Sequence, residues 1–263
     1  MATLGDPGSV RPVLASWLAE RPFSLAMSSG FFSFFAHTGM LATLTQKGFM
    51  PRLVSGSSAG ALVGGAWGAG LEPHKLAAEL LRLRRADFWD PAPGAGLLAG
   101  KSFDRLLRDM LPVTAIERCR VPVLVSVFDI MRRRTHIVRT GDLARAIRAS
   151  CAVPGLFHPV WIDRRPYWDG GILDRPGLAG IPGGERVLFH HISSRSPWRT
   201  TLPIPQRAGM VTLVIEGLPR SGPFRLPEGH RALELARELT SRALDLPIPS
   251  DGIIRIRVPR AEV

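Results

Sequence analysis

A serine between glycines is the first feature of this sequence that points to chemistry. Ser58 lies at the centre of the run Gly56, Ser57, Ser58, Ala59, Gly60, which fits the pattern G-x-S-x-G. An apolar run precedes it, and small residues suited to a helix follow it. In a strand-turn-helix arrangement, such a turn exposes the serine hydroxyl, and the helix amides face the oxyanion of an acyl-transfer reaction. Ser58 is the candidate nucleophile; a glycine-rich crossover without catalytic function is the alternative.

Asp169 is the second candidate, and Gly170 and Gly171 follow it directly. In isolation, an aspartate before two glycines predicts only a turn. A carboxylate next to Ser58 would accept the hydroxyl proton during attack on an ester carbonyl and would return it to the leaving alcohol. Because a carboxylate is a weak base for a serine, this chemistry also needs close positioning and hydrogen bonds to the oxyanion.

Three segments, in this order and spacing, resemble the signature blocks of patatin-like phospholipases. They are the loop from Ser28 to Gly39, the turn around Ser58, and the block ASCAVPG that leads to Asp169. The resemblance covers roughly Leu25 to Pro176. It implies a catalytic dyad without histidine, formed by Ser58 and Asp169, and hydrolysis of carboxylic esters of acyl lipids, with phospholipids or lysophospholipids as the first candidates. It implies no cofactor and no metal.

The loop after the first expected strand departs from the family pattern. Where the family has three glycines, this sequence has Ser29, Gly30 and Phe31, although His37 and Gly39 match the helix start that follows. The resemblance implies that the backbone amides of Gly30 and Phe31, together with Ala59, hold the oxyanion. The substituted loop leaves a catalytically impaired scaffold that binds lipid or protein as an alternative. The phenylalanines at 31, 32, 34 and 35 are candidates for an acyl site or for the core.

Strand-like and helix-like segments alternate along the chain, which predicts an α/β domain with a mainly parallel sheet. The resemblance makes this a patatin-like three-layer sandwich, with helices flanking the central sheet. We expect an N-terminal extension at 1–22 and one hydrolase domain at 23–263, with the motifs in 25–176. The expected strands are 24–27, 53–55, 121–128 at the sheet's centre, 186–192, 210–216 and 252–258, and the expected helices are 37–46, 75–85, 103–111 and 230–244.

Composition narrows the choice of partners and compartment. The net charge is +12, carried by 31 arginines and 3 lysines. Basic clusters allow peripheral contact with an anionic membrane surface, although such clusters are more often solvated faces, and the arginine excess could also reflect GC-rich coding. No nucleic-acid-binding motif accompanies this charge, so no nucleic-acid partner is expected. Cys119 and Cys151 lie far apart, which predicts free thiols and no zinc site. The N-terminus lacks a signal-peptide pattern, so we expect a cytoplasmic protein.

Two further hypotheses concern the histidines and one long uncharged stretch. A conventional triad would pair Ser58 with His190, His191 or His230, although no motif marks any of these histidines. Residues 22–46 carry no formal charge, but serine, glycine, histidine and threonine interrupt them, which argues against a transmembrane helix. The sequence does not indicate an oligomeric state, a lipid head group or an acyl-chain length.

Overall fold

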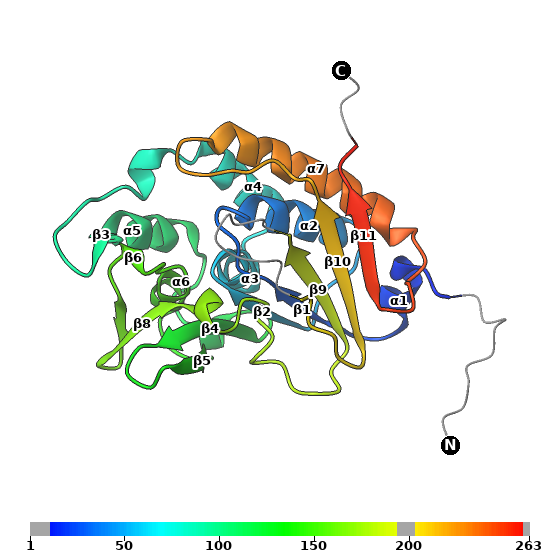
Figure 1. Ribbon diagram of the computed structural model, residues 1–263, viewed down its shortest axis with the longest axis horizontal. Coiled ribbons are helices and arrows are strands. Elements are labelled where there is room, and N and C mark those ends of the chain that lie inside the picture. The colour runs from blue at the N-terminus through cyan, green and yellow to red at the C-terminus, as the bar shows by residue number, and fades with distance from the viewer. Residues whose placement is uncertain (1–10, 194–202, 260–263) are drawn as a thin grey trace.

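A nine-stranded, mainly parallel sheet forms the centre of this computed structural model, which describes residues 11–193 and 203–259 (Figure 1). The strand order is β11-β10-β9-β1-β2-β4-β8-β7, and β5 also pairs with β4. The six strands from β11 to β4 are parallel, and β5, β8 and β7 are antiparallel to their neighbours. The strands are β1 Ser24–Met27, β2 Leu53–Ser57, β4 Val123–Asp129, β5 Arg134–Val138, β7 Val160–Ile162, β8 Arg165–Asp169, β9 Val187–Ile192, β10 Met210–Glu216 and β11 Ile253–Arg257.

Seven α-helices and three short 3-10 helices surround the sheet in the described part of the chain. A separate pair of short parallel strands joins β3 to β6. The α-helices are α1 Leu14–Glu20, α2 Phe34–Gln46, α3 Ala59–Gly68, α4 Pro73–Arg82, α5 Lys101–Met110, α6 Leu143–Ser150 and α7 Leu226–Leu244; the short elements are η1 Arg85–Asp87, η2 Ile116–Arg118, η3 Gly170–Ile172, β3 Gly96–Leu98 and β6 Gly155–Phe157. The expected α/β class, with helices flanking a central sheet, is confirmed.

The expected elements are present, with corrections at some ends and in one position. Helix α2 begins at Phe34 rather than at residue 37, and α4 ends at Arg82 rather than at residue 85. Strand β4 is almost completely buried, as its apolar run predicts. It does not lie at the centre of the sheet, however. Strand β4 is the last of the six parallel strands, and it also pairs with the antiparallel strands β5 and β8. An apolar run reports burial of a strand but not its place in the strand order.

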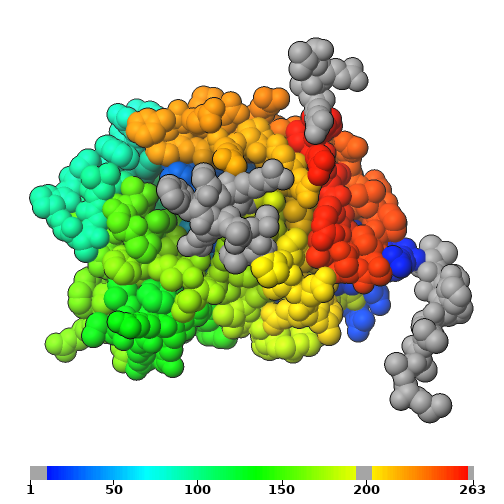
Figure 2. Space-filling view, viewed as in Figure 1, coloured from blue at the N-terminus to red at the C-terminus, as the bar shows by residue number. Residues whose placement is uncertain are grey.

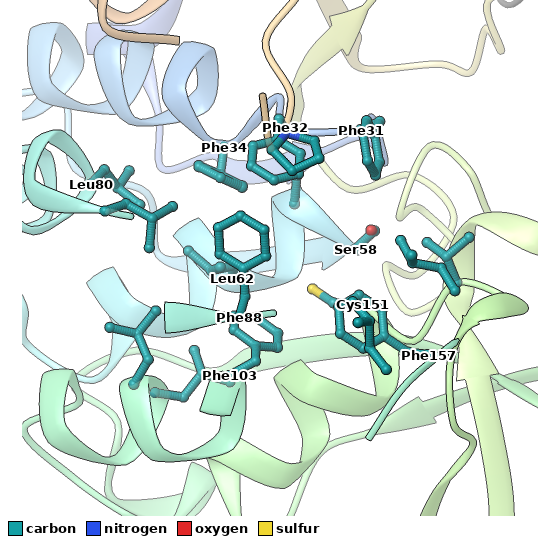
Figure 3. Close-up of a pocket in the computed structure, with 18 of the residues that line it drawn as sticks. Phe31, Phe32, Phe34, Ser58, Leu62, Leu80, Phe88, Phe103, Cys151 and Phe157 are labelled. Atoms are coloured by element: carbon teal, nitrogen blue, oxygen red, sulfur yellow. The ribbon is translucent and has the colours of Figure 1, made fainter. Parts of the chain in front are cut away.

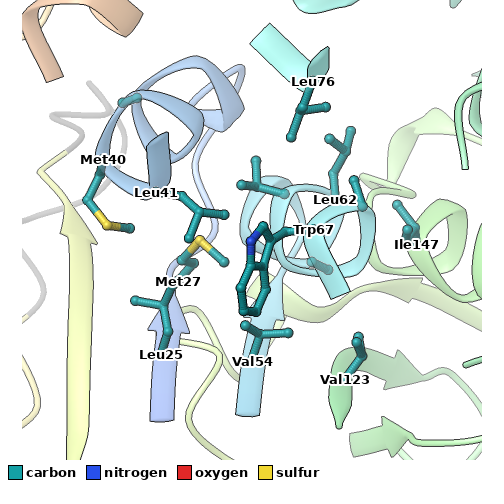
Figure 4. Close-up of a cluster of buried hydrophobic side chains, with 14 of the residues drawn as sticks. Leu25, Met27, Met40, Leu41, Val54, Leu62, Trp67, Leu76, Val123 and Ile147 are labelled. Atoms are coloured by element: carbon teal, nitrogen blue, oxygen red, sulfur yellow. The ribbon is translucent and has the colours of Figure 1, made fainter. Parts of the chain in front are cut away.

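The two faces of the sheet are covered differently. One face packs on the helices, in a continuous core where Met27 and Val54 lie beneath Leu41 and Trp67 (Figure 4). On the other face, Ala26, Leu124 and Phe189 pack against irregular segments. Leu178 and Ile181, which follow η3, supply much of that cover. Alternate residues of each strand therefore serve two separate cores.

The described part of the expected N-terminal extension packs onto the body of the molecule. Leu14 and Leu18 of α1 are buried in the main core. The amide of Leu14 donates to the carbonyl of Leu246 over 3.0 Å, which ties α1 to the residues that follow α7. In Figure 2, the C-terminal elements in orange and red adjoin one another along the top and right of the molecule, whereas the middle of the chain, in teal and green, forms its left end. No helix within 11–193 or 203–259 is long and apolar enough to cross a membrane.

Candidate active site

Ser58 occupies the turn between β2 and α3 in an unusual backbone conformation. Its φ of 53° and ψ of −117° lie in a region that non-glycine residues rarely adopt. Two hydrogen bonds hold this turn: the amide of Ser58 donates to Ser150 Oγ at 2.8 Å, and Ser150 Oγ donates to the carbonyl of Ser126 at 2.6 Å. The Ser58 amide is therefore engaged within the protein, and the strained turn is fixed from α6 and β4.

The two motif glycines are required by close backbone packing. A Cβ at Gly60 would lie 2.1 Å from the carbonyl oxygen of Met27, and a Cβ at Gly56 would lie 2.3 Å from the carbonyl carbon of Gly60. Neither neighbour is a flexible side-chain end, so neither clash can be relieved cheaply. These glycines bring α3 against the end of β1 and thereby set the position of Ser58.

Asp169 reaches the same region through the sheet register. Ser57 pairs with Ser126 of β4, and Asp169 pairs with Val127, the next residue of that strand. Strands β2 and β8 therefore both end beside the same short stretch of β4. A Cβ at Gly170 would lie 2.2 Å from the Ser126 carbonyl oxygen, so this close packing depends on glycine.

The carboxylate of Asp169 is largely shielded from solvent, with 6% of the residue exposed. Its Oδ1 accepts a hydrogen bond from the amide of Gly171 at 2.7 Å, and its own amide donates to the Ala152 carbonyl at 2.9 Å. These contacts fix the orientation of the side chain. The paired glycines after the aspartate therefore have distinct functions: Gly170 permits close packing on β4, and Gly171 donates to the carboxylate.

Cys151 lines the same cavity as Ser58, and its sequence context predicted no catalytic function for it. Burial raises the pKa of its thiol well above the usual value, the Asp169 charge raises it further, and an interaction with the Ser58 side chain lowers it. The Cys151 thiol thus interacts with the Ser58 side chain and lies within range of the Asp169 charge, and it stays protonated at neutral pH. In the sequence, Cys151 lies within the block ASCAVPG that precedes Asp169, and this position was the one feature that could have indicated that it lies near the site.

Ser58 opens onto a cavity of about 140 Å³ whose walls are almost entirely apolar (Figure 3). Phe31, Phe32 and Phe34 lie along one side, and Phe103 and Phe157 lie across from them. Leu80 is at the end remote from Ser58 (Figure 3). Asp169 does not line this cavity. The other lining residues are Gly30, Ala59, Leu62, Glu79, Leu83, Phe88, Trp89, Leu98, Leu106, Leu107, Met110, Cys151, Val153, Leu156 and Pro223.

The three predicted oxyanion residues, Gly30, Phe31 and Ala59, all line the cavity beside Ser58. Among the described residues, no acceptor is bonded to the amides of Gly30 and Phe31. Ala59 is the first residue of α3, where backbone amides have no acceptor within the helix. The loop thus offers unpaired donors near Ser58 although it retains a single glycine of the expected three.

Comparison with protein families identifies this chain. Residues 25–179, more than half of the sequence, match the family model of the patatin-like phospholipases. The chain belongs to the patatin-like phospholipase family. Within the family model lie the loop at Gly30, the turn at Ser58 and the Asp169 strand end.

Relatives of this patatin-like chain include several proteins of the NTE family. An uncharacterized NTE family protein of Mycobacterium tuberculosis is 34% identical over 173 residues, which cover 65% of this chain and 48% of the relative. The lysophospholipase nte1 of Neurospora crassa is 27% identical over 184 residues, or 67% of this chain and 12% of that protein. The chain thus spans about half the length of the mycobacterial relative and much less of the fungal one.

A solved structure supports the fold of the patatin-like chain. The crystal structure of VipD from Legionella pneumophila aligns with a TM-score of 0.55 at 14% sequence identity. The alignment covers 85% of this chain and 67% of VipD.

Within the described part of the chain, no hydrogen bond joins Ser58 to the histidines of the alternative triad. His190, His191 and His230 do not line the cavity that contains Ser58. His190 is fully buried and lies 2.8 Å from His37, measured between their Nδ1 atoms. Burial lowers the pKa of His190 well below its usual value, and neighbouring histidines lower it further. His190 is therefore a neutral core residue beneath the loop that contains Gly30.

Proposed function

We propose that this chain hydrolyses carboxylic esters of acyl lipids, with phospholipids and lysophospholipids first among the candidates. The observation that carries the proposal is the strained serine at one end of an apolar cavity, with a buried carboxylate at the adjacent strand end. An acyl chain matches the cavity, because apolar walls favour a hydrocarbon and offer few partners to a polar ligand. The lysophospholipase named among the relatives supports the same substrate class.

The proposed reaction proceeds in two halves. Asp169 accepts the Ser58 proton while Ser58 Oγ attacks the ester carbonyl carbon, and the amides of Gly30 and Phe31, with that of Ala59, bind the oxyanion. Collapse of the tetrahedral intermediate breaks the ester bond, and Asp169 returns the proton to the leaving alcohol. Asp169 then takes a proton from water while the water oxygen attacks the carbonyl carbon of the acyl-serine. Collapse of this second intermediate breaks the bond to Ser58 Oγ, Asp169 returns the proton to that oxygen, and the fatty acid leaves.

We further propose that the substrate is taken from an anionic membrane surface. Four residues beside the cavity form what we term the mouth surface: Phe31, Arg85, Trp89 and Phe224. Phe31 is 57% exposed and Phe224 is 71% exposed. The Arg85 guanidinium lies 5.7 Å from the Trp89 ring centroid and 5.2 Å from that of Phe224. Exposed aromatic rings beside a cation suit the interface of a bilayer with acidic head groups.

The deciding experiment compares wild type with Ser58→Ala and Asp169→Asn on p-nitrophenyl butyrate and on a lysophospholipid. We expect both variants to lose at least about 100-fold in kcat, because each removes a group used in bond making. Circular dichroism checks that each variant is folded. Phosphonate labelling of Ser58, followed by mass spectrometry, reports the nucleophile independently of substrate choice.

The competing hypothesis is a catalytically impaired scaffold that retains the fold and binds lipid or protein. It is motivated by the loop at Ser29 to Phe31, which keeps one glycine of the family's three. It predicts folded wild-type protein with no ester turnover and no labelling of Ser58. Turnover by wild type that Ser58→Ala abolishes would exclude it.

A further inference from the structure

The loop after β1 is held by side chains from the start of α2. Ser28 makes three hydrogen bonds through its main chain and side chain: its amide donates to the His190 carbonyl at 3.2 Å, its Oγ accepts from the Ile192 amide at 2.9 Å, and its carbonyl accepts from His37 Nε2 at 2.8 Å. The amide of Ser29 donates to the Arg175 carbonyl at 2.7 Å. The Ser28–Ser29 peptide group is therefore fixed at both its oxygen and its nitrogen.

The tautomers of the buried histidine pair follow from these contacts. A carbonyl oxygen only accepts, so His37 Nε2 carries the proton that it donates to Ser28. His37 Nδ1 then has a lone pair and accepts from Nδ1 of His190, 2.8 Å away. His190 thus fixes the ring of His37, and His37 fixes the Ser28 carbonyl. Both rings are fully buried, so water does not compete for these bonds.

Ser33 holds a second peptide group on the other side of Gly30. Its Oγ donates to the Gly30 carbonyl at 2.8 Å, and its amide donates to the same oxygen at 3.1 Å. In a trans peptide group the N–H points away from the carbonyl oxygen. The Gly30 carbonyl therefore faces the start of α2, and the Phe31 amide points in the opposite direction.

Ser33 is also the N-cap residue of α2, which makes this use of its hydroxyl informative. An N-cap serine ordinarily accepts a hydrogen bond from an amide of the first turn. Here Ser33 makes no such capping bond, and its hydroxyl is turned to the Gly30 carbonyl. A Cβ at Gly30 would lie 2.4 Å from Ser33 Oγ, so the glycine makes room for this contact. Ser33 thus acts on the loop rather than on the helix.

We propose that Ser33 and His37 are positioning residues that fix the peptide groups on either side of the Gly30 amide, so that the Gly30 and Phe31 amides meet the oxyanion. This inference rests on the proposed hydrolase function. This loop has only one of the family's three glycines, so its backbone has less conformational freedom. Side-chain hydrogen bonds then orient the amide donors toward the oxyanion. Transition-state stabilisation depends on such preorganised donors.

The test is steady-state hydrolysis of p-nitrophenyl butyrate by wild type and Ser33→Ala, with Thr45→Val as the matched control. Thr45 also donates its hydroxyl to backbone carbonyls of α2, those of Leu41 and Ala42, but at the opposite end of the helix. We expect Ser33→Ala to lower kcat about 10-fold or more, with KM changed less than about 2-fold, because a misaligned donor weakens only the transition state. Thr45→Val should retain wild-type kcat and KM.

His37 supplies a second, independent readout through a conservative replacement. The amide of His37→Gln reaches the place of Nε2 and can donate to the Ser28 carbonyl, whereas His37→Ala cannot. We expect His37→Gln to retain more kcat than His37→Ala at similar KM. Wild-type kcat in folded Ser33→Ala would overturn the inference while leaving the hydrolase proposal intact. Wild-type protein with neither turnover nor phosphonate labelling would overturn both.

Discussion

At the scale of the residue, the proposed chemistry depends on a serine whose backbone is held by a side chain from a distant part of the chain. Ser58 and Asp169 stand in short motifs whose residue types are dictated locally by tight turns. Ser150 is 92 positions from Ser58, yet its Oγ holds the Ser58 amide. Such contacts follow from the order of strands in the sheet, which brings β4 and α6 beside β2, and no local pattern encodes them.

Cys151 gives a residue-scale prediction about accessibility of the site to thiol reagents. Because the pKa of its thiol is raised, the thiolate is scarce at neutral pH, and we expect alkylation by N-ethylmaleimide to be slow at pH 7 and faster at pH 9. An adduct beside Ser58 should block the cavity and abolish ester hydrolysis in wild type and in Cys119→Ser. Cys151→Ala should keep its starting activity after the same treatment. Equal inactivation of Cys151→Ala would place the reactive group elsewhere.

At the scale of the element, apolar periodicity located the strands and helices, but the ends predicted from side-chain type were wrong for some of them. Phe34 and Phe35 belong to α2, although the phenylalanine-rich run before residue 37 gave no helix start signal. The residues that line the cavity could not be predicted from the sequence either, because α4 and α5 come to lie beside Ser58 only in the folded chain. The period of a helix shows which face is apolar, and it does not show whether that face meets a core or a ligand.

Helix α4 allows a prediction about acyl-chain length with a neighbouring control. Leu80 lines the end of the cavity remote from Ser58 and is 5% exposed, whereas Leu81 is 42% exposed. Replacing Leu80 by Phe shortens the cavity, so hydrolysis of p-nitrophenyl laurate should fall at least about 10-fold relative to the butyrate, since poorly accommodated chains lose apolar burial. Leu81→Phe should keep the wild-type ratio of the two rates. An unchanged ratio in folded Leu80→Phe would mean that the chain binds elsewhere.

At the scale of the whole molecule, the net charge of +12 allowed contact with an anionic surface but did not show which face of the molecule would make that contact. The structure supplies a candidate face, because the mouth surface combines Arg85 with exposed Phe31 and Phe224. We expect wild type to bind vesicles that contain phosphatidylglycerol more tightly than vesicles of phosphatidylcholine alone, and less tightly as salt rises.

Two exposed apolar residues at opposite ends of the sheet test this orientation. Phe224→Ala should weaken vesicle binding roughly 10-fold, because burial of a phenylalanine ring contributes about 1.5–3 kcal/mol. Met50, which is 56% exposed and precedes β2 at the end of the sheet away from Ser58, provides the control. Met50→Ala should bind like wild type in a flotation assay. Weaker binding by Met50→Ala and not by Phe224→Ala would reverse the proposed orientation.

The buried histidines couple the stability of the whole fold to pH. Burial lowers the pKa of His37 to about 4, opposed by its hydrogen bond to Ser28, and burial also lowers the pKa of His191 to about 4. The unfolded chain, with histidine pKa values near 6.5, therefore binds protons that the folded protein excludes between about pH 6.5 and pH 4. Because the unfolded state takes up more protons in this window, the free energy of unfolding must fall as the pH falls.

For fully buried His37 the expected loss between pH 7 and pH 5 is about 2 kcal/mol, since each unit between pH and the unfolded pKa contributes about 1.4 kcal/mol. Urea unfolding at the two pH values measures it. His37→Gln cannot take up the proton, so its stability should vary less with pH by about that amount, whereas exposed His74→Gln should follow wild type. A wild-type protein equally stable at both pH values would show that the buried histidines take up protons in the fold as readily as in the unfolded chain. A charged His37 would still donate to the Ser28 carbonyl, but its Nδ1 would then donate to His190 rather than accept from it.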